Sequence, residues 1–202
     1  MNESAMRRPL LLTLCLAALL AAPTGCGQAP REPGPLAGAS MGGPFTLTDQ
    51  NGHRVSDRDY AGKFRLVYFG YTSCPDVCPT DLQVIGAGLR ALESRDAARA
   101  AQIVPIFITV DPARDTPAVL RQYLAHFHPR LVGLTGTEAE IAAAAREYRI
   151  YYQRGDATPG GGYMVNHSRM AVLYGPDGAP IAMIPYDHGP GGVADELARW
   201  VQ

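Results

Sequence analysis

The stretch from Gly70 to Gln83, GYTSCPDVCPTDLQ, places two cysteines between a predicted strand and a predicted helix. Before it runs RLVYFGY (65–71), a β-rich apolar segment typical of a buried strand. After it, four apolar residues recur at the spacing of one helix face, namely Leu82, Ile85, Leu89 and Leu92. Cys74 and Cys78 are therefore expected where a central strand passes into a helix.

This position has consequences for the chemistry of the two thiols. The backbone N–H groups and the positive dipole end of a helix N-terminus favour an anion, so thiol pKa values fall there. Pro79 suits the first helical turn, because its missing N–H would be unpaired there. The sequence therefore predicts that Cys74 and Cys78 are readily ionised thiols near the surface.

Strand and helix signals alternate along the remainder of the chain. Strands are expected at 45–48, 65–71, 103–110, 149–153, 170–174 and 181–184, and a short apolar stretch lies at 131–134. Besides the helix after the cysteines, helices are expected at 117–127, 138–148 and 193–201, the first capped by Thr116. Pro105, inside a strand, indicates a bulge or an edge. This alternation predicts an α/β fold with a central mixed β-sheet and helices on both faces.

The N-terminal 26 residues predict export. Arg7 and Arg8 precede an uncharged apolar stretch (9–22) that is shorter than the ~20 residues of a membrane-spanning helix, which is typical of a signal peptide. The stretch ends in PTGC, which resembles a bacterial lipoprotein processing site with Cys26 as the lipidated residue. Ordinary cleavage nearby, which would leave Cys26 free, is the alternative. We expect a periplasmic domain that a lipid anchors to the membrane.

Composition limits the remaining possibilities. Residues 27–43 are dominated by Gly, Pro, Ala and Ser and predict a flexible tether, with one folded domain at 44–202. A hydrophobic content of 47% suits a globular domain. A formal net charge of −1 gives no electrostatic reason to expect nucleic acid as a partner.

Four stretches resemble the Sco/SenC family of thioredoxin-fold proteins, which deliver copper to the dinuclear copper centre of cytochrome c oxidase. They are FGYTSCPDVCPTDL (69–82), TVDPARDTP (109–117), YRIYYQRG (148–155) and YMVNHSRMAVLYGPDG (163–178). In that family two cysteines and one histidine hold the copper, and the resemblance carries these roles to Cys74, Cys78 and His167. It implies one copper ion (Cu(I), Cu(II) or both) per domain and a thioredoxin-like fold. It also implies the copper-binding subunit of the oxidase as partner, with periplasmic copper chaperones or thiol reductants as further partners.

The donor types fit copper on chemical grounds. Thiolates select Cu(I) and imidazole suits Cu(II), whereas structural zinc normally takes four protein ligands. Three ligands would leave a coordination position open, which a protein that passes its ion on requires. Asn166 stands before the histidine where the family more commonly has Asp.

Three alternatives remain open from the sequence. Cys74 and Cys78 could form a structural disulfide, although a loop this short gains little chain-entropy stabilisation. They could be the redox pair of a thiol–disulfide oxidoreductase that keeps the cysteines of the oxidase subunit reduced for metallation, which leaves His167 without a role. A peroxide-sensitive thiolate would need an activating base or cation that the sequence does not locate. Asp111, Arg114 and Asp115 could form a recognition surface, or a strand-end turn in which Asp115 and Thr116 cap the next helix.

Overall fold

The structure is a computed structural model that describes residues 32–157 and 162–202. The predicted signal peptide, the predicted lipidation site at Cys26 and the first part of the tether (27–31) lie outside these ranges. Within the described ranges, no helix combines the length and the apolar character needed to cross a bilayer.

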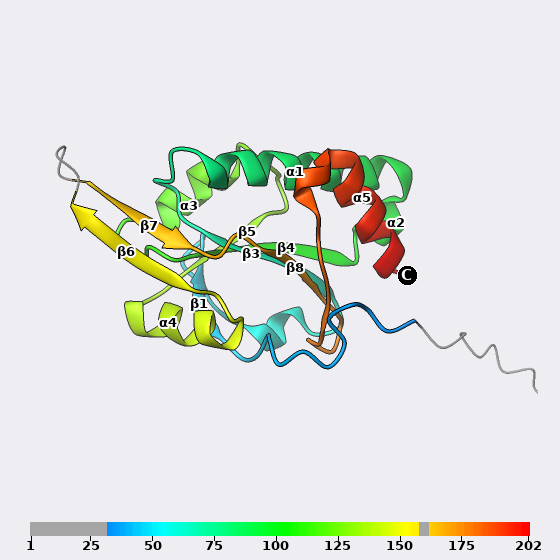
Figure 1. The fold of residues 1–202 in the computed structure, drawn as a ribbon, viewed down its shortest axis with the longest axis horizontal. Coiled ribbons are helices and arrows are strands. Elements are labelled where there is room, and N and C mark those ends of the chain that lie inside the picture. Colours follow the sequence, from blue (N-terminus) through cyan, green and yellow to red (C-terminus); the bar gives the residue numbers. More distant parts are fainter. Residues whose placement is uncertain (1–31, 158–161) are drawn as a thin grey trace, which may run out of the picture. The chain divides into compact units, whose positions relative to one another are not determined.

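The centre of the fold is a seven-stranded sheet with the order β2-β1-β5-β4-β3-β8-β9 (Figure 1). The strands are β1 (Thr46–Asp49), β2 (Arg54–Ser56), β3 (Phe64–Gly70), β4 (Ile103–Thr109), β5 (Val132–Thr135), β8 (Ala171–Tyr174) and β9 (Pro180–Met183). The inner pairs β3–β4 and β4–β5 are parallel, while the flanking pairs are antiparallel. The predicted mixed sheet is therefore confirmed, and every residue of β3 is buried.

Helices cover both faces of this sheet (Figure 1). They are α1 (Val77–Arg95), α2 (Ala97–Ala100), α3 (Pro117–Leu124), α4 (Glu138–Glu147) and α5 (Gly189–Trp200), with short 3-10 helices η1 (Asp57–Tyr60) and η2 (Tyr186–His188). Apolar residues of α1, α3 and α5 share one buried cluster, and those of α4 belong to a second cluster. A Cβ on Gly88 of α1 would lie 2.5 Å from the Cβ of Val193 in α5, so only glycine permits this approach of the two helices.

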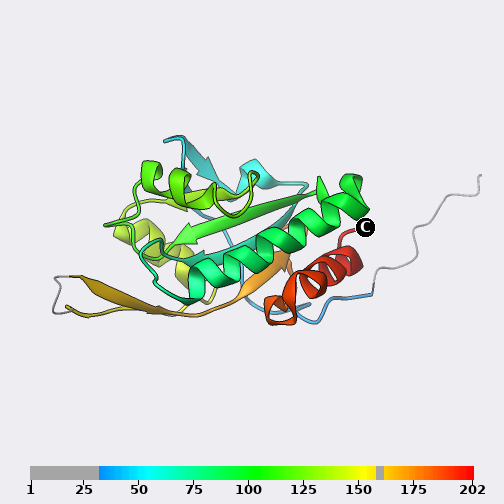
Figure 2. The same ribbon diagram turned by 90° about the horizontal axis from the view of Figure 1, so that it is seen from above.

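A separate two-stranded sheet carries the histidine of interest. β6 (Tyr152–Ala157) and β7 (Tyr163–His167) pair antiparallel, with Tyr152 opposite His167, and the hairpin projects from the main sheet (Figure 2). The sequence placed one strand at 149–153 and none at 163–167. The early start was wrong because Arg149 adopts φ 57°, the left-handed conformation that ends α4. Ile150 N–H then closes the helix end by donating to the carbonyl of Ala145 at 2.8 Å.

Local signals elsewhere give a mixed outcome. Thr116 caps α3 by accepting a hydrogen bond from the N–H of Val119, as predicted. Pro105 lies in the central strand β4 without a recorded bulge, but the pairing with β5 begins only at Ile106. Strand β4 therefore has one neighbour, β3, at the level of this proline.

Part of the predicted tether contacts the domain. Leu36 N–H donates to the carbonyl of Ile181 at 3.0 Å, and Gly42 N–H donates to the carbonyl of Glu147 at 2.9 Å. Leu36 and Met41 also pack against the buried core. Contacts therefore begin before residue 44, the boundary expected from composition.

Candidate metal centre

The loop between β3 and α1 sets the positions of both cysteines. Cys74 N–H donates to the carbonyl of Tyr71 at 3.4 Å, and α1 begins at Val77. Cys78 N–H then donates to the sulfur of Cys74 at 3.5 Å, so this sulfur faces the first turn of the helix. A Cβ on Gly70 would lie 3.2 Å from the sulfur of Cys78, so the glycine that ends β3 leaves room for this side chain.

The two thiols differ in acidity, although both are free and buried. Burial by itself raises the pKa of Cys74, but hydrogen bonds from the backbone N–H groups of Cys78, Asp76 and Val77 outweigh it and lower the pKa. Burial dominates at Cys78, which has no exposed surface, and raises the pKa to about 12. The prediction of an acidic thiol is confirmed for Cys74 and wrong for Cys78. Neither thiol lies at the surface, although Ser73, Pro75 and Asp76 of the same loop are exposed.

His167 reaches the cysteines from the end of β7. Its Nε2 lies 3.3 Å from the sulfur of Cys78, and its Nδ1 lies 3.0 Å from the carbonyl oxygen of Ser168. Since only a protonated Nδ1 can donate to that carbonyl, the Nε2 lone pair faces the sulfur. Burial lowers the pKa of His167, which favours the neutral imidazole that a metal requires.

Two tyrosine rings enclose the imidazole. The rings of Tyr68 and Tyr71 meet the ring of His167 edge-on, with centroid distances of 6.5 and 5.9 Å. Tyr71 also directs its hydroxyl group at the sulfur of Met164, 3.9 Å away on β7. Packing thus fixes the plane of the imidazole that faces Cys78.

The three predicted ligands form one neighbourhood through pairwise contacts. Cys78 contacts Cys74 through its backbone and His167 through its sulfur. Over the described parts of the chain, however, no three His, Cys, Asp or Glu side chains already stand in an arrangement that could hold a metal ion. Binding of one ion by all three would therefore require side-chain adjustment. The donor set of two thiols and one imidazole still fits copper better than the oxygen-preferring cations.

Asp115, in the loop between β4 and α3, holds the cysteine loop in place. This fully buried carboxylate accepts hydrogen bonds from the N–H and hydroxyl of Thr72 at 3.0 and 2.6 Å, and from the hydroxyl of Thr109 at 2.5 Å. It therefore ties the loop before Cys74 to the end of β4. The cap of α3 comes from Thr116 rather than from Asp115.

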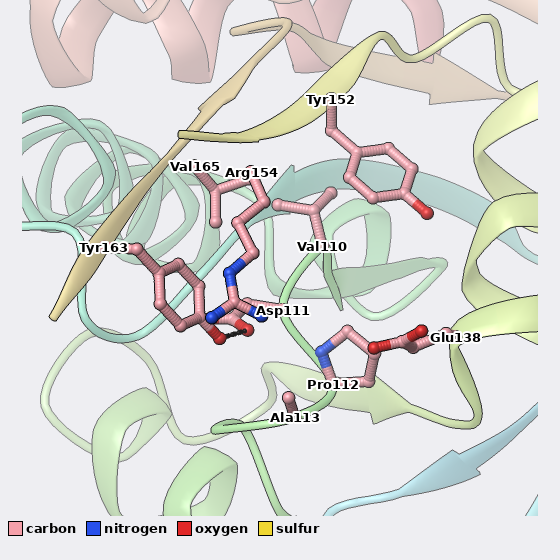
Figure 3. A pocket seen from close by; sticks show the side chains of 9 residues that line it. All are labelled: Val110, Asp111, Pro112, Ala113, Glu138, Tyr152, Arg154, Tyr163 and Val165. Carbon is pink, nitrogen blue, oxygen red and sulfur yellow. Dashed lines mark hydrogen bonds between the residues drawn. The ribbon is translucent and has the colours of Figure 1, made fainter. Parts of the chain in front are cut away.

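Asp111 and Arg114 fasten the beginning of β7. Tyr163 Oη donates to Asp111 Oδ1 at 2.7 Å, and Arg114 donates to both Asp111 and the carbonyl of Tyr163. The guanidinium carbons of Arg114 and Arg154 lie 3.8 and 3.6 Å from the centroid of the Tyr163 ring. Figure 3 shows Arg154, Tyr163 and Asp111 converging at a pocket of about 330 Å³. These contacts support the interpretation of Asp111 and Arg114 as a strand-end turn. They also add Tyr163, for which no role was predicted.

Comparisons with known proteins agree with this architecture. The SCO1/SenC family model matches residues 34–202. The mitochondrial protein SCO1 of Saccharomyces cerevisiae is 44% identical over 140 residues, which are 69% of this chain and 46% of that protein. The SCO2-like protein of Rickettsia felis is 39% identical over 153 residues, 74% of this chain and 72% of that protein.

A solved structure gives the same result. Bradyrhizobium japonicum ScoI with copper bound is 43% identical, with a TM-score of 0.72 over 79% of this chain and 99% of that chain. This protein therefore belongs to the Sco/SenC family, and its fold is thioredoxin-like as predicted. The chain spans about half the length of the yeast and human SCO1 proteins that it matches.

Proposed function

We propose that this protein is a copper metallochaperone that binds one copper ion through Cys74, Cys78 and His167. It would deliver this ion to the dinuclear copper centre of cytochrome c oxidase during assembly. The observation that carries the proposal is the 3.3 Å contact between the sulfur of Cys78 and Nε2 of His167, since it joins α1 to β7. The copper-bound ScoI structure, at 43% identity, supports copper as the cargo.

The three proposed ligands differ in how readily each becomes able to bind the ion. The more acidic thiol of Cys74 offers a thiolate first, and His167 presents a neutral nitrogen. Cys78 must lose its proton as the metal binds, because burial holds its pKa near 12. Three ligands would leave one position open for a ligand of the acceptor. A ligand of the copper-binding subunit of the oxidase would bind the ion at this position before the ion leaves its first three ligands.

A second candidate function is thiol–disulfide exchange, and the unequal thiols favour it. The thiolate of Cys74 would attack a disulfide of the oxidase subunit, form a mixed disulfide and release one partner thiol. Cys78 would then attack Cys74, release the second partner thiol and leave a Cys74–Cys78 disulfide. A thiol reductant would restore the pair. This function does not use His167, which separates it from copper delivery.

The N-terminal segment supports a proposal about where the protein is located. We propose that the domain faces the bacterial periplasm and that a lipid on Cys26 holds it at the membrane. Residues from 27 onward would link the anchor to the domain. Periplasmic copper chaperones would then be the chemical source of the ion, and thiol reductants would keep both cysteines reduced.

Copper titration of the reduced protein tests the proposal. Wild type should bind one equivalent of Cu(I), and a Cys74→Ser/Cys78→Ser double variant should bind none tightly. His126→Ala is the matched control for His167→Ala, since His126 is exposed and its ring hydrogen-bonds to the carbonyl of Tyr123. Stoichiometric copper in the double-cysteine variant would overturn the site. If His167→Ala keeps exchange activity and loses copper transfer, copper delivery is separated from the redox function.

A further inference from the structure

The strand that carries His167 lies outside the main sheet. Among the described residues, β7 forms its ladder with β6 alone, and this hairpin is separate from the seven-stranded sheet. The contacts of Tyr163 fasten only the beginning of β7. After His167, the irregular segment 168–170 leads to β8. Ser168 N–H donates to the carbonyl of Tyr151 at 2.8 Å, which ties this segment to the residue before β6 but not to α1, the helix of Cys78.

An ion pair beside the site supplies a contact to α1. Arg169 Nη2 donates to Asp81 Oδ1 at 2.7 Å, and Arg169 Nε donates to Asp81 Oδ2 at 3.1 Å. Asp81 lies in α1 one turn after Cys78, and Arg169 lies two residues after His167. A two-pronged guanidinium–carboxylate pair fixes orientation as well as distance. The pair therefore joins the helix of one predicted ligand to the segment of another.

Two tyrosines add to this connection: Tyr68 contacts the imidazole, and Tyr186 holds the segment of Arg169. Tyr68 Oη donates to Asp81 Oδ2 at 2.8 Å, while its ring meets the ring of His167 edge-on. Tyr186 Oη donates to the carbonyl of Arg169 at 3.0 Å. Asp81 is only 3% exposed. It accepts three hydrogen bonds, one from Tyr68 and two from Arg169, and both donors lie near His167.

We propose that Asp81 and Arg169 form a clamp that positions His167 against Cys78. Neither residue binds the metal, and both act by holding the loop and the tyrosine ring that fix the imidazole. The metal-dependent part of this inference rests on the proposed copper function. The placement of the ring can be measured without any metal, so the two ideas can fail separately.

The first test is NMR of the His167 imidazole in the metal-free protein. Wild type should show the Nδ1–H tautomer and ring-proton shifts displaced by Tyr68 and Tyr71, compared with exposed His126. In Arg169→Gln, and in Asp81→Asn/Arg169→Gln without either charge, we expect these shifts to move toward those of His126. Arg169→Lys, which keeps the charge but loses the two-pronged geometry, should lie between them.

The matched control is Arg95→Gln. Arg95 forms an ion pair with Asp195 at 2.7 Å that also joins α1 to another element, and its side chain is 50% exposed against 47% for Arg169. The control variant should leave the His167 resonances unchanged. Arg169 is exposed enough that its replacement should permit folding, and a folded spectrum with dispersed methyl signals verifies this for each variant.

The second test is copper affinity. Since partners that orient a ligating histidine contribute about 10- to 100-fold to metal affinity, Arg169→Gln should lose that factor for Cu(II) and less for Cu(I). The nitrogen hyperfine structure of the Cu(II) EPR spectrum should weaken in parallel. Unchanged His167 resonances in both clamp variants would overturn the clamp. Altered resonances in a protein that binds no copper would support the clamp and refute the metallochaperone function.

Discussion

The two thiols of the CxxxC pair are expected to react with an alkylating reagent at very different rates. The thiolate is the reactive form. Amide groups of the first turn of α1 lower the pKa of Cys74 below the ordinary 9.0. Burial raises the pKa of Cys78 from 9.0 to about 12. The difference can be tested by adding iodoacetamide to the reduced, metal-free protein.

The size of the difference follows from these values. Near neutral pH, a change from 9.0 to about 12 lowers the thiolate fraction of Cys78 by about 10³. A more basic thiolate is a better nucleophile, and a Brønsted coefficient of about 0.5 returns about 30-fold of that loss. Cys78 should therefore react about 30-fold more slowly than an ordinary thiol, before its complete burial slows it further. The lowered pKa of Cys74 widens the gap by enlarging its thiolate fraction.

Peptide mass spectrometry after acid quenching measures both rates in one sample. Alkylation should be followed between about pH 7 and pH 9, with Cys74→Ser and Cys78→Ser reporting each thiol without the other. We expect Cys74 to be modified first, by a factor on the order of 30. Equal rates, or faster modification of Cys78, would show that the helix amides do not activate Cys74 and that burial does not suppress Cys78.

Four further predictions follow from the same structure. Oxidised protein with a Cys74–Cys78 disulfide should bind no copper until it is reduced, and copper should protect both thiols from alkylation; equal alkylation of the metal-free and loaded forms would contradict this. His167→Ala should cost more Cu(II) affinity than Cu(I) affinity. Because burial lowers the pKa of His167, protons should displace Cu(II) from the imidazole only below the ordinary histidine pKa of about 6.5. Identical Cu(II) affinity profiles of wild type and His167→Ala from about pH 5 to 8 would exclude His167 as a ligand. Cys26→Ser should move the protein from the membrane to the soluble fraction, whereas continued membrane binding would mean that the N-terminal stretch is itself the anchor. Gly88→Ala should lower the free energy of unfolding by about 1–3 kcal/mol, because the new Cβ would meet Val193. Gly191→Ala, in open space on α5, is the control. Equal stability of both variants in a denaturant titration would show that α1 and α5 can separate at little cost.

The local features of this protein can be predicted from residues close together in the chain. The strand before the cysteines, the helix after them and the cap at Thr116 depend on side-chain periodicity and on residues close in the chain. The alternation of elements was sufficient to predict the mixed α/β sheet. The family motifs also singled out Cys74, Cys78 and His167, and the structure places these residues in one neighbourhood.

The acidity of the two thiols and the start of β6 depend on how the elements pack. Cys78 follows the same local pattern as Cys74, yet the core encloses it completely and reverses the direction of its pKa change. The left-handed residue Arg149, which delays β6, depends on how α4 ends rather than on the apolar pattern of the next strand.

The contacts that hold His167 depend entirely on the folded chain. Asp81 and Arg169 are ordinary charged residues in the sequence, and no local pattern indicates that they meet. Their pairing depends on the packing of α1 beside the segment between β7 and β8, which brings together residues far apart in the chain. Burial and long-range pairing arise only when the elements pack, and so a single sequence names the candidate ligands without giving their acidity or their supports.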